Sequence, residues 1–121
     1  MKILIAVFIG GGLGSVIRYS ISRLVSYFYT FSFPLATFIS NIVSCILLSL
    51  FILYIYNKNG QQDLLKVFVL VGICGGLSTF STFSYETVQL FKSGYTFVAI
   101  ANIVISVLAC TLMMYYLLRK V

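Results

Sequence analysis

The sequence predicts an all-α integral membrane protein with four transmembrane helices. Of its 121 residues, 61% are hydrophobic and 8% are charged, whereas about 25% of the residues in a typical soluble domain are charged. Four long apolar stretches are present, at residues 3–29, 34–56, 64–91 and 94–118. Each is long enough to cross a bilayer, which takes about 20 helical residues. These helices use most of the chain, so we expect residues 1–121 to form one transmembrane domain.

The first stretch has the composition of a helix that packs closely against a neighbour. Gly10 and Gly14 form a small-xxx-small pair, which is typical of close contact between membrane helices. Lys2 before an apolar run also resembles the start of a signal peptide, but no cleavage pattern followed by a soluble chain is present. Arg18 lies deep in this stretch. Either it extends to the membrane surface, or it faces a wet vestibule and attracts anions there.

The second and fourth stretches each carry a stripe of polar residues. Pro34 stands where the second helix should begin, a position that tolerates its missing N–H, and residues 57–60 are typical of a turn after this helix. The stripes, spaced three or four residues apart and so on one helical face, consist of Thr37, Asn41 and Ser44 in the second stretch and Asn102 and Ser106 in the fourth. Such stripes either bond helices together or line a polar pathway.

The third stretch has an unusual centre, where glycines, hydroxyl residues and two phenylalanines replace aliphatic side chains. Unsatisfied polar groups cost several kcal/mol each in hydrocarbon, so three polar stripes together favour a pathway for a polar species. The pair Gly75-Gly76 is a poor helix former, and a break there would free backbone carbonyls that can coordinate a hard cation such as sodium. Alternatively, the two glycines only permit close packing, and their spacing leaves both interpretations open.

The polar groups of the spans are mainly hydrogen-bond donors, which suit an anion. Glu86 is the only carboxylate inside a candidate span, whereas cation channels and proton-coupled transporters usually need intramembrane acids or histidines. Phe80 and Phe83 are three residues apart and can present positive ring edges along one wall. The chain has no histidine and no recognisable triad, metal cluster or phosphate loop, so we do not expect an enzyme. The cysteines are widely spaced and are expected to be small buried hydrophobic residues, at Cys45, Cys74 and Cys110.

The net charge of +6 indicates a membrane topology rather than a nucleic-acid partner, because the basic residues are scattered singly at helix ends and in loops. Four spans place both termini on one side of the membrane. Five basic residues fall on that side, Lys2, Lys58, Lys66, Arg119 and Lys120, and three fall nearer the other, Arg18, Arg23 and Lys92. This bias favours cytoplasmic termini only slightly, so insertion in both orientations is plausible.

Three motifs together make the chain resemble the Fluc/CrcB family of fluoride channels over nearly its whole length. The first helix carries Gly11-Gly12-Leu13-Gly14 followed by Arg18-Tyr19, the second Pro34-Leu35-Ala36-Thr37 with Asn41, and the third Gly75-Gly76-Leu77-Ser78-Thr79-Phe80-Ser81-Thr82-Phe83. Two departures from the family pattern are Ala36 in place of glycine and Ser78 in place of threonine. Neither removes a hydroxyl or a backbone carbonyl from the expected sites, so we expect small effects.

The resemblance implies an antiparallel, dual-topology homodimer in the cell membrane, with two pores that lower cytoplasmic fluoride by passive efflux. It implies that Phe80, Phe83 and Asn41 line the pores, and more weakly that Thr37, Ser81, Thr82 and Ser106 do so. It also implies a structural sodium ion, shared between subunits at a break in the third helix and held by the backbone carbonyls of Gly75 and Ser78. Paired homologous subunits occur in such families, so a second homologue is a possible partner.

Two other classes of membrane protein have similar dimensions. A small multidrug exporter is also a four-helix dimer, but its mechanism needs a carboxylate in the first helix, and residues 3–29 contain no Asp or Glu. A non-transporting assembly subunit would use the polar stripes only as packing surfaces. The test for such an assembly subunit is whether the purified protein alone moves an ion.

Overall fold

The computed structural model describes residues 1–57 and 63–119. The described chain is helical, and its elements in order are α1 (Lys2–Phe28), α2 (Leu35–Asn57), α3 (Asp63–Lys66), η1 (Val67–Cys74), α4 (Gly75–Leu77), α5 (Phe80–Lys92) and α6 (Thr96–Leu118). Elements α3 to α5 together make one span, and four spans are long and apolar enough to cross a membrane. The prediction of an all-helical protein with four spans is therefore confirmed. Part of the turn predicted at residues 57–60 lies outside the described residues.

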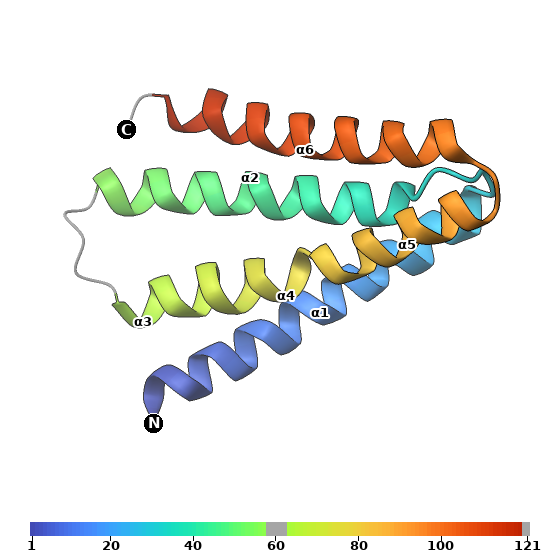
Figure 1. The fold of residues 1–121 in the computed structure, drawn as a ribbon. Coiled ribbons are helices and arrows are strands. Elements are labelled where there is room, and N and C mark those ends of the chain that lie inside the picture. Colours follow the sequence, from blue (N-terminus) through green and yellow to red (C-terminus); the bar gives the residue numbers. More distant parts are fainter. Residues whose placement is uncertain (58–62, 120–121) are drawn as a thin grey trace.

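The spans run back and forth, so that alternate connections lie at opposite ends of the molecule (Figure 1). The N-terminus, the C-terminal end of α6 and the start of α3 lie at one end. The α1–α2 and α5–α6 connections lie at the other end. The N-terminus and the C-terminal end of α6 are therefore on the same side, as an even number of spans requires.

Short local signals set the helix ends beside these two connections. Pro34 immediately precedes α2, and its carbonyl accepts the first helical bond, from Phe38 N–H at 3.1 Å. At the end of α5, Gly94 has a positive φ of 81°, and Tyr95 N–H donates to the Leu90 carbonyl at 2.9 Å. This arrangement is a Schellman cap. Because Gly94 belongs to that cap, the last helix begins at Thr96, two residues later than the apolar pattern indicates.

The distribution of polarity is that of a membrane protein. Large apolar side chains cover the outside. The buried polar side chains among the described residues are serines, threonines and one asparagine, namely Thr37, Ser40, Ser44, Ser49, Thr87, Asn102 and Ser106. Ser40 and Ser49 donate to carbonyls one turn earlier in their own helix. Thr37, Ser44, Thr87 and Asn102 take part in bonds between spans, and Ser106 bonds Asn102 on its own helix. This interior is therefore held together by hydrogen bonds as well as by packing.

The first half of the third span packs against α1 at backbone distance. Gly10 and Gly14 are buried on α1, and a Cβ added to Gly10 would lie 3.0 Å from the Gly72 Cα. A Cβ on Gly14 would overlap the Ile73 carbonyl oxygen, and one on Gly76 would overlap the Gly11 carbonyl oxygen. The small-xxx-small prediction for α1 is thus confirmed, and Gly76 is explained by close packing. Such contact replaces the hydrophobic driving force that is absent between helices in lipid.

The third span changes neighbours along its length. Its first half, η1 with π-helical turns and then α4, contacts α1, whereas α5 contacts α6. Between them, Ser78 and Thr79 have extended backbone angles, with ψ of 154° and 117°. These two residues re-aim the chain from α1 toward α6, and α2 contacts both halves.

Candidate functional site

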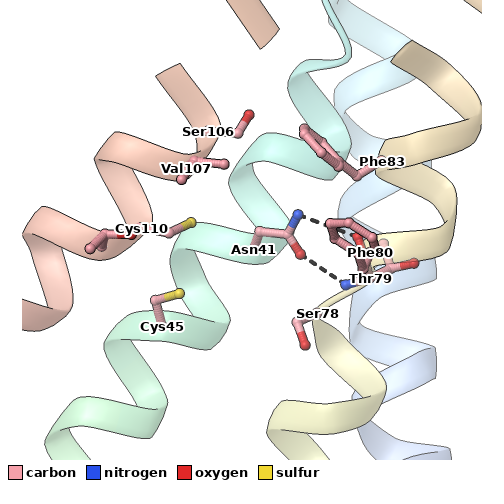
Figure 2. A pocket seen from close by; sticks show the side chains of 10 residues that line it. Asn41, Cys45, Ser78, Thr79, Phe80, Phe83, Ser106, Val107 and Cys110 are labelled. Atoms are coloured by element: carbon pink, nitrogen blue, oxygen red, sulfur yellow. Dashed lines mark hydrogen bonds between the residues drawn. The ribbon is translucent and has the colours of Figure 1, made fainter. Parts of the chain in front are cut away.

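A groove of about 330 Å³ lies where the third span is extended. It is lined by residues of α2, the third span and α6, namely Asn41, Cys45, Ser78, Thr79, Phe80, Phe83, Ser106, Val107, Cys110 and Thr111. Figure 2 shows Asn41 of α2 pointing toward Thr79 and Phe80, with the α6 residues on the opposite wall. The groove is apolar along most of its surface, with a few polar groups converging on one end, a combination typical of ligand sites.

Asn41 is bound to the backbone of the extended segment. Thr79 N–H donates to Asn41 Oδ1 at 2.8 Å, and Asn41 Nδ2 donates to the Thr79 carbonyl over a longer distance of 3.5 Å. In an uninterrupted helix, Thr79 N–H would instead donate to the Gly75 carbonyl. Asn41 therefore satisfies a backbone group that the interruption releases, and one hydrogen of its Nδ2 remains for the groove.

Thr79 also begins the second half of the span. As the N-cap of α5, its Oγ1 accepts from Thr82 N–H at 3.3 Å and donates to Thr82 Oγ1 at 3.0 Å. The first backbone N–H groups of α5 point toward the extended segment and carry the positive end of the helix dipole. This end of the groove thus presents partial positive charge without a formally charged group.

Two phenylalanine rings form a wall of the groove. The rings of Phe80 and Phe83 have centroids 5.8 Å apart and planes inclined by 36°. Phe83 is half-buried, but Phe80 is 80% exposed. Phe80 therefore faces away from the packed interior of its own chain.

The end of the first half-span is crowded with hydrogen bonds to carbonyls. The Cys74 carbonyl accepts from the Ser44 and Ser78 hydroxyls, each at 2.9 Å. Arg18 Nε donates to the Gly76 carbonyl at 3.1 Å, so a cation sits at the negative end of this half-helix. Neither of the two roles expected for Arg18 from the sequence included this bond.

A second hydrogen-bonded chain runs behind the groove from α6 to α5. Ser106 Oγ donates to Asn102 Oδ1 at 3.2 Å, and Asn102 Nδ2 donates to Thr87 Oγ1 at 2.9 Å. The Thr87 hydroxyl in turn donates to the Phe83 carbonyl at 2.8 Å. The hydroxyl hydrogen of Ser106 is thereby directed at Asn102, and the chain fixes the position of Phe83 relative to α6.

Glu86, on α5, has a hydrogen-bond partner on α2. Thr37 Oγ1 donates to Glu86 Oε1 at 2.9 Å. The other carboxylate oxygen, Oε2, is buried and has no hydrogen-bond partner within the described part of the chain. The pair lies farther along α5 from the groove, and Glu86 lines a separate polar pocket of about 390 Å³ near the α1–α2 and α5–α6 connections.

The structure thus brings together only part of the set of site residues predicted from the sequence. Asn41, Phe80, Phe83, Ser106 and Ser78 line one groove. The other four pore and vestibule residues lie outside it: Thr37 at Glu86, Ser81 exposed on α5, Thr82 in the cap of that helix, and Arg18 on the Gly76 carbonyl. Gly75 is exposed just before the groove, and a Cβ there would meet nothing within 4 Å.

Sequence reasoning missed three residues that organise the site. Thr79 was treated as one hydroxyl of a cluster, although its backbone is the partner of Asn41. Thr87 and Asn102 connect Phe83 to Ser106. The signal for Asn102 was its place in the stripe of the fourth span, but no pattern within one helix identifies a partner on another.

Comparison with known proteins identifies the family of the chain. Residues 5–117 match the family model described as CrcB-like protein, Camphor Resistance (CrcB). The chain belongs to the CrcB family. A member from Flavobacterium psychrophilum, named fluoride-specific ion channel FluC, is 41% identical over 107 residues, which cover 88% of this chain and 86% of that protein. A FluC from Phocaeicola vulgatus is 38% identical over 93% of this chain and 95% of its own length.

A FluC from Pyrococcus horikoshii is 39% identical over 107 residues, which cover 88% of this chain and 85% of that protein. Family membership and the four apolar helices identify the chain as a multi-pass membrane protein. The CrcB match spans all four helices, including every residue that lines the groove.

Proposed function

We propose that this protein is a fluoride-selective ion channel of the cell membrane, which exports fluoride passively from the cytoplasm and so protects the cell from fluoride. The observation that carries the proposal is the groove at Ser78–Thr79, where neutral donors and two aromatic rings converge. The FluC names of its relatives indicate the ion. A channel carries out no chemical reaction, so no catalytic residue is assigned.

The chemistry of the groove suits a small, strongly hydrated anion. Fluoride gives up hydrating water only where several donors replace it at close range. The free Nδ2 hydrogen of Asn41, the first-turn N–H groups of α5 other than that of Thr82, and the ring edges of Phe80 and Phe83 are donors of this kind. They are neutral, so they attract the ion without the fixed charge that would hold it too tightly for conduction.

The proposed working unit is an antiparallel homodimer with two pores. In this proposal the partner covers the face of α5 on which Phe80, 80% exposed, and Ser81 lie. In this proposal the partner's surface closes the open side of the groove and turns it into a pore. Fluoride would then pass Phe80 and Phe83, with Asn41 and Ser106 on the opposite wall. Thr37, Ser81 and Thr82 would serve the parts of the path beyond the groove.

The residues at the interruption also fit the proposed structural sodium ion. Thr79 N–H donates to Asn41 rather than to the Gly75 carbonyl, which leaves that oxygen without its usual helical donor. Gly75 is exposed on the face proposed for the partner, and sodium prefers such oxygen ligands. In this proposal the carbonyls of Gly75 and Ser78, with their counterparts in a second subunit, hold the ion, which would stabilise the interruption at the dimer interface.

Arg18 would contribute from the vestibule. One guanidinium nitrogen is engaged with the Gly76 carbonyl, and the remaining N–H groups are available to attract anions. The half-buried position of this arginine would keep its charge beside the pathway rather than within it.

The test is fluoride efflux from liposomes that contain only this purified protein, followed with a fluoride electrode and repeated with chloride. Rapid fluoride loss with little chloride loss is the expected result. A folded dimer that releases no fluoride, while the same preparation mixed with a homologous subunit does, would show that a partner is obligatory. Absence of fluoride flux in both preparations would contradict the proposed function.

A further inference from the structure

Cys45 and Cys110 form a pair of neighbouring thiols, although they are far apart in the sequence. Cys45 is on α2 and Cys110 is on α6, and both line the same groove. Figure 2 shows both sulfur atoms in the space between these two helices. Both thiols are half-buried, whereas the sequence led us to expect small buried hydrophobic residues.

The pair is open to the groove, whereas the third cysteine is not. Cys45 and Cys110 are half-buried free thiols, and both line the groove together with Asn41. Cys74 is buried, with 3% of its surface exposed, and does not line the groove. Two thiols are therefore both adjacent to each other and reachable, which is what a chelating thiol ligand requires.

We propose that Cys45 and Cys110 form a two-coordinate site for one soft metal ion with a filled d shell, of the class of Cu(I), Ag(I) and Hg(II). Soft thiolate ligands select such ions, and two opposed thiolates complete a linear coordination shell. The described residues contain no group of three or more His, Cys, Asp or Glu side chains able to hold a metal, which disfavours a tetrahedral zinc site here.

Binding requires no oxidant or reductant. One Hg(II) ion replaces two thiol protons, so that two S–H bonds break, two Hg–S bonds form and two protons are released to solvent. The valence state of the metal and of both sulfurs is unchanged. The site does not depend on the proposed channel function, because its two ligands are defined by the packing of α2 on α6.

The experiment uses the full-length protein with Cys74→Ala, which leaves only the paired thiols. Hg(II) is added in steps to the purified protein, and the remaining free thiols are counted with a maleimide. A shared site consumes both thiols at one Hg(II) per chain, with two protons released and a sulfur-to-mercury charge-transfer absorption. Mass measurement of the intact adduct then gives one metal on a single chain.

Matched variants are Cys45→Ser and Cys110→Ser in the same Cys74→Ala background, each checked for folding by elution volume. Each variant retains one groove thiol, so an excess of glutathione should strip Hg(II) from both variants while the two-thiol protein keeps it. We expect the Hg(II) affinity of each variant to be about a hundredfold lower than that of the two-thiol protein, because the variants lose the effective-concentration advantage of chelation. A requirement for two Hg(II) per chain, a metal that bridges two chains, or equal retention by the serine variants would overturn the proposal.

Discussion

Asn41 and Thr79, on different spans, pair through a side-chain amide and a backbone peptide. The stronger bond runs from Thr79 N–H to Asn41 Oδ1 at 2.8 Å, and the amide nitrogen faces the Thr79 carbonyl. Asn41 thus stabilises the extended residues at which the third span changes neighbours. The same side chain lines the groove, so the geometry of the proposed pathway and the interruption of the helix depend on one residue.

We expect Asn41→Asp to reduce fluoride flux by about tenfold to a hundredfold, the range for loss of one buried hydrogen-bond donor. Aspartate retains the acceptor for Thr79 N–H but places a second carboxylate oxygen against the Thr79 carbonyl. It also introduces a negative charge into a path proposed for an anion. Flux is measured by fluoride electrode with elution volume as the check on folding. Wild-type flux in this variant would remove Asn41 from the pathway.

Phe80→Ile should nearly abolish fluoride flux while leaving stability almost unchanged. The ring is 80% exposed, so its loss creates no cavity in the chain's own core. The aliphatic side chain lacks the positive ring edge that we propose for the anion. The matched control is Phe91→Ile, on the same helix but outside the groove and also exposed. Equal flux in the two variants would refute the assignment of Phe80.

Gly14→Ala should destabilise the protein by about 1–3 kcal/mol, the usual cost of overpacking. The added methyl group would overlap the Ile73 carbonyl oxygen, and the backbone cannot yield as a flexible side chain does. Gly12→Ala, two residues earlier, meets nothing within 4 Å and should gain up to about 1 kcal/mol from helix propensity. Thermal unfolding in detergent compares the two variants. A lower melting temperature for the Gly12 variant than for the Gly14 variant would contradict the packing described here.

Thr37→Val should lower the free energy of unfolding by about 1–3 kcal/mol, because it removes the donor from a buried carboxylate. Glu86 Oε1 accepts from the Thr37 hydroxyl at 2.9 Å, and Oε2 has no partner among the described residues. Thr37→Ser keeps the hydroxyl and is the control. Chemical or thermal unfolding in detergent measures the difference. If valine and serine prove equally stable, the hydrogen bond contributes little to the fold.

The candidate site was only partly predictable because its parts follow different rules. Hydroxyls and amides in an apolar span are visible in a sequence. Of the site residues named from it, the structure places Asn41, Ser78, Phe80, Phe83 and Ser106 along one groove. Whether a hydroxyl faces that groove or a neighbour is not visible. Thr37 bonds Glu86, 49 residues away, and no helical spacing encodes such a contact.

The sequence by itself determined that the chain has four membrane spans, since length and hydropathy alone select helices that satisfy their own backbone in lipid. It also determined that α1 presents glycines at close-packing spacing. The tertiary structure decided which spans meet, where Thr79 leaves the helix for Asn41, and that Cys45 lies beside Cys110. The physical reason is that an apolar helix surface is about as well satisfied by lipid as by another apolar helix. Neighbours are therefore chosen by backbone approach and by individual hydrogen bonds, which hydropathy and periodicity do not record.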